Sequence, residues 1–334
     1  MKAFTGLIFF VLAAGFLLSC NNTSLQKISY TGTTQGTYYR ITFYHPDTAV
    51  SQQKIEEVMN AFDASVSVYN PASIITKVNA QNAPVVVDDW FLDSWSIAKD
   101  VSEATDGAFD CTIGPLVEAW GFSFRDKVSM NQDIVDSLLR LVDYRKVSVE
   151  GNTVRLEIPG MHLDFNAVAQ GLSVDVIAEL LEARGVTSYL VDIGGEVKAA
   201  GTKPGGANWR VGIEKPVDKA GYGENMQAIV QISDKALATS GSYRKFYLKD
   251  GKKYSHTIDP HTGYPVTHSL LSATVVTENC GYADAWATAM MVLGTERSKE
   301  FLAGRNDLDV FLIYADEQGE LQTWATEGFK SIME

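Results

Sequence analysis

Apolar residues recur at three- and four-residue spacing in five segments of this 334-residue chain, and this spacing predicts helices. The segments are 51–62 (Ile55, Val58, Met59, Phe62), 88–107, a third marked by Ile134, Leu138 and Leu141, a fourth carrying Val174, Ile177, Ala178 and Leu181, and 283–294. Asp88 or Asp89 is a suitable N-cap for the second helix. Gly107, Gly185 and Gly294 follow three of the segments and predict where these helices end.

Between the helices, runs of alternating and β-branched residues predict strands. They comprise a glycine turn and strand within 31–44, a hairpin over 146–158 that turns at Gly151-Asn152, a strand–Gly-Gly–strand unit over 188–201, and strands at 209–216, 227–233, 236–248 and 270–277. Strands interspersed with helices indicate an α+β or mixed α/β fold. No long linker divides the chain, so we expect residues 28–334 to form one catalytic unit, of one or two lobes.

A targeting segment precedes this unit. Lys2 is followed by an apolar run, Leu7–Leu18, which is too short to span a membrane as a helix. A serine stands directly before Cys20, the pattern that lipoprotein signal peptidase reads. We predict removal of residues 1–19, lipidation of Cys20, a polar tether over 20–27, and anchoring on the periplasmic side of the cell membrane, the inner membrane being favoured. The alternative is an ordinary secretory signal with a chance cysteine.

The composition is that of an acidic globular protein. Apolar residues make up 46% and charged residues 21% of the chain, and loss of Lys2 changes the net charge from −13 to −14. Nucleic-acid binding is not expected, because it requires a basic face. An anionic ligand would need metal ions or backbone amides. Once Cys20 is lipidated only Cys111 and Cys280 remain, and their pairing is left open.

The helix at 283–294 carries the clearest candidate chemistry. Asp284 and Thr288 are four residues apart, so their side chains share one face of the helix. A carboxylate with a hydroxyl suits a hard cation such as Mg²⁺, which takes few protein ligands. The alternative is that Asp284 interacts with the positive end of its own helix and Thr288 only packs.

Two other segments have a ligand-binding and a structural interpretation each. Asp164 ends a strand before a helix start, where free N–H groups can bind an anion; alternatively, it or Asn166 caps that helix. Phe109 could stack on a flat ring while Asp110 bonds its polar edge; alternatively, they are a buried phenylalanine and a turn aspartate. The small residues around Gly241 would let the backbone approach a ligand closely.

The loop at 255–265 (SHTIDPHTGYP) is rich in turn formers, and its histidines lack the spacing of a helix face. A triple-histidine metal site is therefore not favoured, whereas Asp259-Pro260 and Thr262-Gly263 indicate turns. His256, at the end of a hairpin arm, is the best acid–base candidate, because its unperturbed pKa suits proton transfer near neutrality. The chain lacks the GxGxxG, GxSxG and Walker motifs.

Taken in order, eight segments resemble one family, the ApbE-type FAD:protein FMN transferases. They are 35–39 (QGTYY), 69–79 (YNPASIITKVN), 107–122 (GAFDCTIGPLVEAWGF), 163–181, 189–201, 238–246 (ATSGSYRKF), 255–266 and 283–294. The resemblance implies mixed sheets with flanking helices and FAD in a cleft between two lobes. It also implies Mg²⁺-dependent transfer of FMN from FAD to a Thr or Ser hydroxyl of a partner protein, with AMP leaving.

The resemblance assigns roles by position. Asp284, Thr288 and the backbone carbonyl of Ala167 correspond to the Mg²⁺ ligands, Asp284 being also a catalytic residue, and His256 corresponds to the histidine that assists the acceptor hydroxyl. The implied FAD contacts are Gln35, Tyr69, Ala108, Phe109, Asp110, Asp164, Gln170 and Ile258. The implied acceptors are membrane redox subunits such as those of Nqr- or Rnf-type complexes.

Two positions depart from the family pattern. The family usually has Met before the first Gly-Thr block, where this chain has Gln35, and Lys or Glu is common where Gln170 stands. Gln170 can hydrogen-bond but brings no charge, which affects the hold on FAD or metal. Two other functions share this chemistry: a metal-dependent FAD pyrophosphatase, in which water replaces the hydroxyl, and a non-catalytic FAD-binding lipoprotein.

Overall fold

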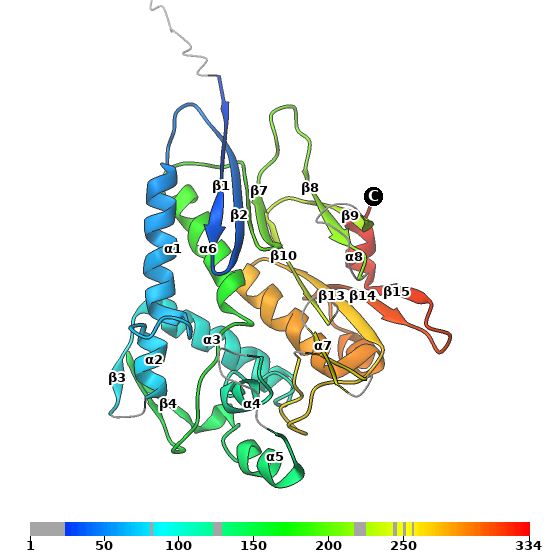
Figure 1. Cartoon of the computed structure of the whole chain (residues 1–334). Helices are drawn as coiled ribbons and strands as arrows, with labels where there is room; N and C mark the ends of the chain where they lie inside the picture. Colours follow the sequence, from blue (N-terminus) through cyan, green and yellow to red (C-terminus); the bar gives the residue numbers. More distant parts are fainter. Residues whose placement is uncertain are drawn as a thin grey trace, which may run out of the picture.

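An eight-stranded antiparallel sheet forms the centre of the molecule (Figure 1). The computed structural model describes residues 24–80, 83–122, 129–216, 225–242, 246–249, 252–255 and 257–334, so Cys20 and His256 lie outside the described residues. In sheet order the strands are β1 (Gln26–Thr34), β2 (Thr37–His45), β6 (Tyr189–Ile193), β7 (Glu196–Ala200), β10 (Lys235–Gly241), β13 (Leu270–Thr277), β14 (Asp309–Ala315) and β15 (Leu321–Ala325).

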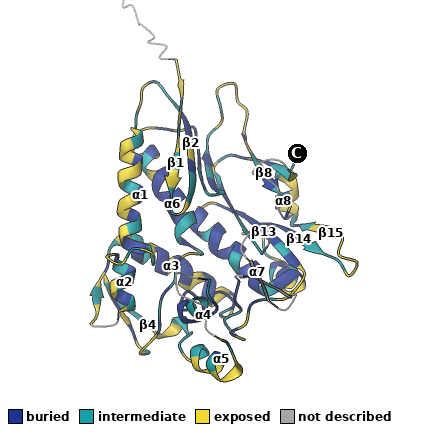
Figure 2. Cartoon of the chain, in the orientation of Figure 1, coloured by how far each residue is buried: buried dark blue, intermediate teal, exposed yellow. Residues whose placement is uncertain are grey.

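Helices cover one face of the sheet (Figure 1). They are α6 (Ala169–Glu182) and α7 (Cys280–Leu302), which lie on the strands, and α1 (Gln52–Val66) and α3 (Asp89–Ala104), which pack against them. Asp88 is the N-cap of α3, where its carboxylate accepts the Phe91 N–H at 3.0 Å. Much of α7 is buried (Figure 2), because it lies between the sheet and the helices α3 and α6.

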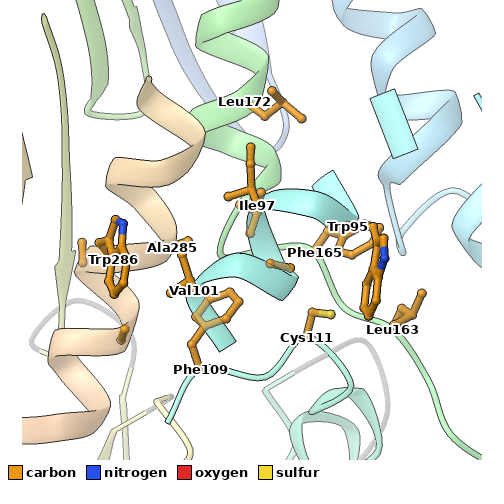
Figure 3. Packing of buried hydrophobic residues seen from close by; sticks show 14 of the residues in the cluster. Trp95, Ile97, Val101, Phe109, Cys111, Leu163, Phe165, Leu172, Ala285 and Trp286 are labelled. Atoms are coloured by element: carbon orange, nitrogen blue, oxygen red, sulfur yellow. The ribbon is translucent and has the colours of Figure 1, made fainter. Parts of the chain in front are cut away.

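The largest apolar cluster lies between α3, α7 and the sheet. Figure 3 shows Ile97 and Val101 of α3 close to Phe109, Phe165 and Ala285. The opposite face of the sheet is covered by β8 (Trp209–Glu214), β9 (Met226–Ile232) and α8 (Glu327–Ile332). The described residues contain no helix with the length and apolar character needed to cross a membrane.

Smaller elements lie below α1 and α3 in the view of Figure 1. They are α2 (Ile74–Asn79), α4 (Gly114–Ala119), α5 (Gln132–Leu139), a 3₁₀ turn (Tyr144–Lys146), and a sheet of β3 (Val85–Val86), β5 (Thr153–Leu156) and β4 (Val147–Glu150). A separate hairpin pairs β11 (Phe246–Lys249) with β12 (Lys252–Ser255). Ile258 packs with Leu116, Trp120 and Val135 in a local core of this region.

The predicted α+β class is confirmed, but two predicted elements were wrong in extent. The strand over 236–248 ends at Gly241 as β10, and β11 belongs to a different sheet. The helix predicted for 283–294 begins three residues earlier, at Cys280, and α7 as a whole extends to Leu302. Gly294 (φ 76°, ψ 178°) has non-helical backbone and ends the first helical segment, as the sequence predicted, and a second helical segment follows this kink.

Candidate active site

The start of α6 and the second turn of α7 meet at a buried carboxylate. Asp284 is only 6% exposed, and its Oδ2 accepts the backbone N–H of Gly171 at 3.1 Å. A Cβ at Gly171 would lie 2.3 Å from the Cys280 carbonyl oxygen, so only glycine permits this approach. Since α7 begins four residues before Asp284, this side chain serves the start of α6 rather than the start of its own helix.

The hydrogen bond from Gly171 caps the start of α6. Gly171 lies in the first turn of this helix, where backbone N–H groups have no acceptor within the helix, and Asp284 supplies one. Ala167, whose carbonyl is the third predicted metal ligand, lies in the turn just before α6. Thr288 lies one turn further along α7, with its hydroxyl 3.0 Å from that of Ser240 on β10. These three oxygen donors suit Mg²⁺, which prefers hard oxygen ligands.

A second buried acid, Glu196, stands at the start of β7 and is 9% exposed. Burial and the nearby Asp284 raise the pKa of Glu196 well above its usual range, and burial raises the pKa of Asp284 to about 7. The sequence analysis missed Glu196; its only signal was an acid directly after the Gly194-Gly195 turn. In both acids burial disfavours the ionised form. A bound divalent cation would favour ionisation and balance the resulting negative charge.

Gln35 and Gln170 are hydrogen-bonded near the start of α6. The Gln170 side-chain amide donates to the Ile193 carbonyl at 3.0 Å and to Glu196. Gln35, in the left-handed region at the β1–β2 turn (φ 50°), donates to Asp63 at 3.1 Å and accepts from the Ser173 hydroxyl at 3.3 Å. Both positions that depart from the family pattern are therefore hydrogen-bonded around the start of α6.

Tyr69 and Asp164 form a second group. Tyr69 is 60% exposed, and its pKa is raised by burial of its hydroxyl and by the charge of Asp164. Asp164 accepts the Asn166 N–H at 2.8 Å, a local turn, and burial raises its pKa. The alternative interpretation, in which Asp164 or Asn166 caps the helix, was wrong, because the N-cap of α6 is Val168 and makes no side-chain cap.

Ala108, Phe109 and Asp110 are buried parts of the fold. Phe109 is 4% exposed within the main core (Figure 3). The Asp110 carboxylate accepts from the Thr112 N–H (2.8 Å) and hydroxyl (2.7 Å) and from the Tyr144 N–H (3.0 Å). The structure thus has the buried phenylalanine and turn aspartate of the alternative interpretation, and the FAD contacts implied for these residues stay predictions.

The loop that follows β12 forms the turns predicted for it. The Gly263 N–H donates to the Asp259 carbonyl at 2.8 Å, and the Trp120 indole donates to the Gly263 carbonyl at 2.8 Å. His261 contacts the Asp106 carbonyl at 2.8 Å through Nε2, whereas His268 contacts the Met291 carbonyl at 2.7 Å. The two histidines therefore contact carbonyls in different parts of the chain. Within the described ranges, no group of three His, Cys, Asp or Glu side chains is placed to bind a metal.

Cys111 and Cys280 are both buried and free, so they do not pair.

Residues 35–312 match the model of the ApbE family. The chain belongs to the ApbE family. It is 33% identical over 96% of its length to the FAD:protein FMN transferase of Vibrio cholerae (97% of that protein) and 35% identical over 90% to that of Escherichia coli K12 (88% of that protein).

Solved structures of ApbE proteins have the same fold as this chain. The flavin transferase ApbE from Vibrio cholerae matches with a TM-score of 0.82 and 31% identity, over 92% of this chain and 99% of that one. The apo form of the flavinyl transferase ApbE from Pseudomonas stutzeri matches with a TM-score of 0.83 and 31% identity, over 92% and 97%. The predicted resemblance to the ApbE family is therefore confirmed.

Proposed function

We propose that this protein transfers FMN from FAD to a Thr or Ser hydroxyl of an acceptor protein. The acceptor oxygen forms a bond to the phosphorus on the FMN side of the pyrophosphate. The bond from that phosphorus to the bridging oxygen breaks, AMP leaves with this oxygen, and the hydroxyl proton goes to a base. Family membership and the names of the curated relatives support the reaction. The observation that carries it is Asp284, buried against the first turn of α6.

Three donors on this chain would hold Mg²⁺: the Asp284 carboxylate, the Thr288 hydroxyl and the Ala167 carbonyl. When bound, the ion would neutralise pyrophosphate charge and stabilise the leaving phosphate. His256 is the proposed base for the acceptor hydroxyl, on the strength of its residue type and its place in the resemblance. Gln35 and Gln170 are proposed FAD contacts on the strength of their places in the resemblance, and both side chains are hydrogen-bonded around the start of α6.

Lipidation of Cys20 would hold the enzyme on the periplasmic side of the membrane. This location suits an acceptor that is itself a membrane redox subunit, such as those of Nqr- or Rnf-type complexes. The proposal rests on the sequence pattern before Cys20.

The test uses the purified protein with FAD, Mg²⁺ and an acceptor domain that carries a flavinylation threonine. A fluorescent acceptor band after denaturing electrophoresis, formed with equimolar AMP and lost with EDTA and in Asp284→Ala, is the expected result. Asp307→Ala, which removes a carboxylate from an exposed ion pair with Arg305, is the matched control and should retain the band. Free FMN and AMP without a labelled band would indicate a pyrophosphatase, and bound FAD without AMP would contradict both enzymatic functions.

A further inference from the structure

The crossing of α6 and α7 contains two reciprocal hydrogen bonds between carboxylates and backbone amides. Asp284 of α7 accepts the Gly171 N–H of α6, and Asp175 of α6 accepts the Gly281 N–H of α7, the latter at 2.9 Å through Oδ2. On each helix the acid lies about one turn after the glycine, so the glycine and the acid of one helix share the face that contacts the other helix. Each helix thus holds the first turn of the other.

A third element joins at Asp175. This side chain is 3% exposed, and its other oxygen, Oδ1, accepts from the Lys198 ammonium of β7 at 2.8 Å. Asp175 therefore links α6, α7 and the central sheet through one carboxylate. Lys198 lies two residues after Glu196 on the same strand, so the link reaches the strand that carries the second buried acid.

The packing at this crossing leaves little freedom. A Cβ at Gly281 would lie 2.8 Å from Ile97 Cδ1 and 3.3 Å from Leu172 Cβ. Figure 3 shows Ile97 and Leu172 facing each other at this point. The Cys280 thiol lies 3.6 Å from the Val197 carbonyl of β7. The first turn of α7 is thus closely packed against α3, α6 and β7, and Asp175 supplies the acceptor for its buried N–H.

We propose that Asp175 is a positioning residue for the metal ligands of the proposed reaction. By accepting the Gly281 N–H, it sets the position of the first turns of α7, which carry Asp284 and Thr288, against the start of α6. This inference rests on the proposed function, and it assigns Asp175 no contact with FAD or metal. Residues that orient metal ligands from behind contribute to metal affinity without touching the ion.

The test compares two double variants that both lack the Asp175–Lys198 ion pair. In Asp175→Asn/Lys198→Gln, the new amide can still accept the Gly281 N–H and donate to Gln. In Asp175→Ala/Lys198→Gln, the acceptor is lost. Thr326→Ala is the stability control, because it removes the side-chain acceptor of the Val310 N–H (3.0 Å) on the opposite face of the sheet. Affinity for Mn²⁺ is measured by electron paramagnetic resonance, with the melting temperature in parallel.

We expect the Asn/Gln variant and Thr326→Ala to keep the parent affinity, and the Ala/Gln variant to bind Mn²⁺ about 10- to 100-fold more weakly. In the Ala/Gln variant, saturating Mg²⁺ should restore much of kcat. Parent-like Mn²⁺ affinity in the Ala/Gln variant, or losses that simply follow melting temperature in all three, would overturn the role of Asp175 alone. Failure of the parent protein to bind Mn²⁺ would overturn the proposed metal together with this inference.

Discussion

At the scale of single residues, the site is dominated by the cost of burying carboxylates. Asp284 and Glu196 are almost inaccessible to solvent, and burial is the largest cause of the raised pKa of each. Asp284 accepts a backbone N–H and Glu196 accepts from the Gln170 amide, and both of these donors are uncharged. Without a cation, ionisation of this pair therefore opposes folding.

This predicts a pH dependence of stability for the metal-free protein. An unfolded aspartate ionises near pH ~4, whereas folded Asp284 keeps its proton up to a pKa of about 7. The folded state binds more protons across this window, so the free energy of unfolding is largest below it and falls as pH rises through it. Urea denaturation with EDTA at pH 5 and pH 7.5 should show this fall, and Mg²⁺ should reverse it at pH 7.5.

Asp284→Asn is the informative variant in that experiment, because its side chain stays neutral at both pH values. It should lose less stability than the parent between pH 5 and pH 7.5. Asp307→Asn, at an exposed ion pair, should follow the parent. Equal pH dependence in Asp284→Asn and the parent would contradict the assignment to Asp284.

At the scale of elements, the approach of α6 to α7 depends on Gly171. A methyl group there would lie 2.3 Å from the Cys280 carbonyl oxygen and 2.8 Å from Asp284 Cβ. Because neither backbone nor the buried carboxylate can move away freely, Gly171→Ala should destabilise the protein by about 2–3 kcal/mol. It should also raise the Mg²⁺ concentration needed for half-maximal transfer, because the Gly171 N–H is displaced from Asp284.

Gly185→Asn, just beyond the other end of α6, is the control for Gly171→Ala. Gly185 has φ 80° just beyond α6, and nothing lies within 4 Å of an added Cβ. Asparagine tolerates this left-handed conformation, so the variant should change stability much less. Chemical denaturation of both variants tests the prediction, and equal losses would show that the close helix contact is unimportant.

At the scale of the whole molecule, the sheet separates the candidate site from a second apolar layer. Phe329 of α8 is fully buried and stacks on Phe311 of β14, with ring centroids 5.3 Å apart. Phe329→Ala should cost about 3–5 kcal/mol of unfolding free energy, the usual effect of truncating a buried phenylalanine. Transfer activity measured well below the melting temperature should remain, because this residue lies on the face away from α6 and α7.

The sequence alone was sufficient for features that depend on neighbours along the chain. Helical periodicity predicted α1, α3, α5, α6 and α7, and spacing alone placed Asp284 and Thr288 on one face. Motif order predicted the family. Such features are encoded locally, because a helix repeats every 3.6 residues and its side chains follow that repeat.

Only the tertiary structure decided which distant groups meet. Asp175 and Gly281 are 106 residues apart, and Gly171 and Asp284 are 113 apart, so no spacing rule joins them. Glu196 is an ordinary strand residue in the sequence and becomes a buried acid only when β7 packs beneath Gln170 and α7. The second helical segment of α7, beyond the kink at Gly294, was also decided there, because burial of residues such as Ser298 and Leu302 stabilises it.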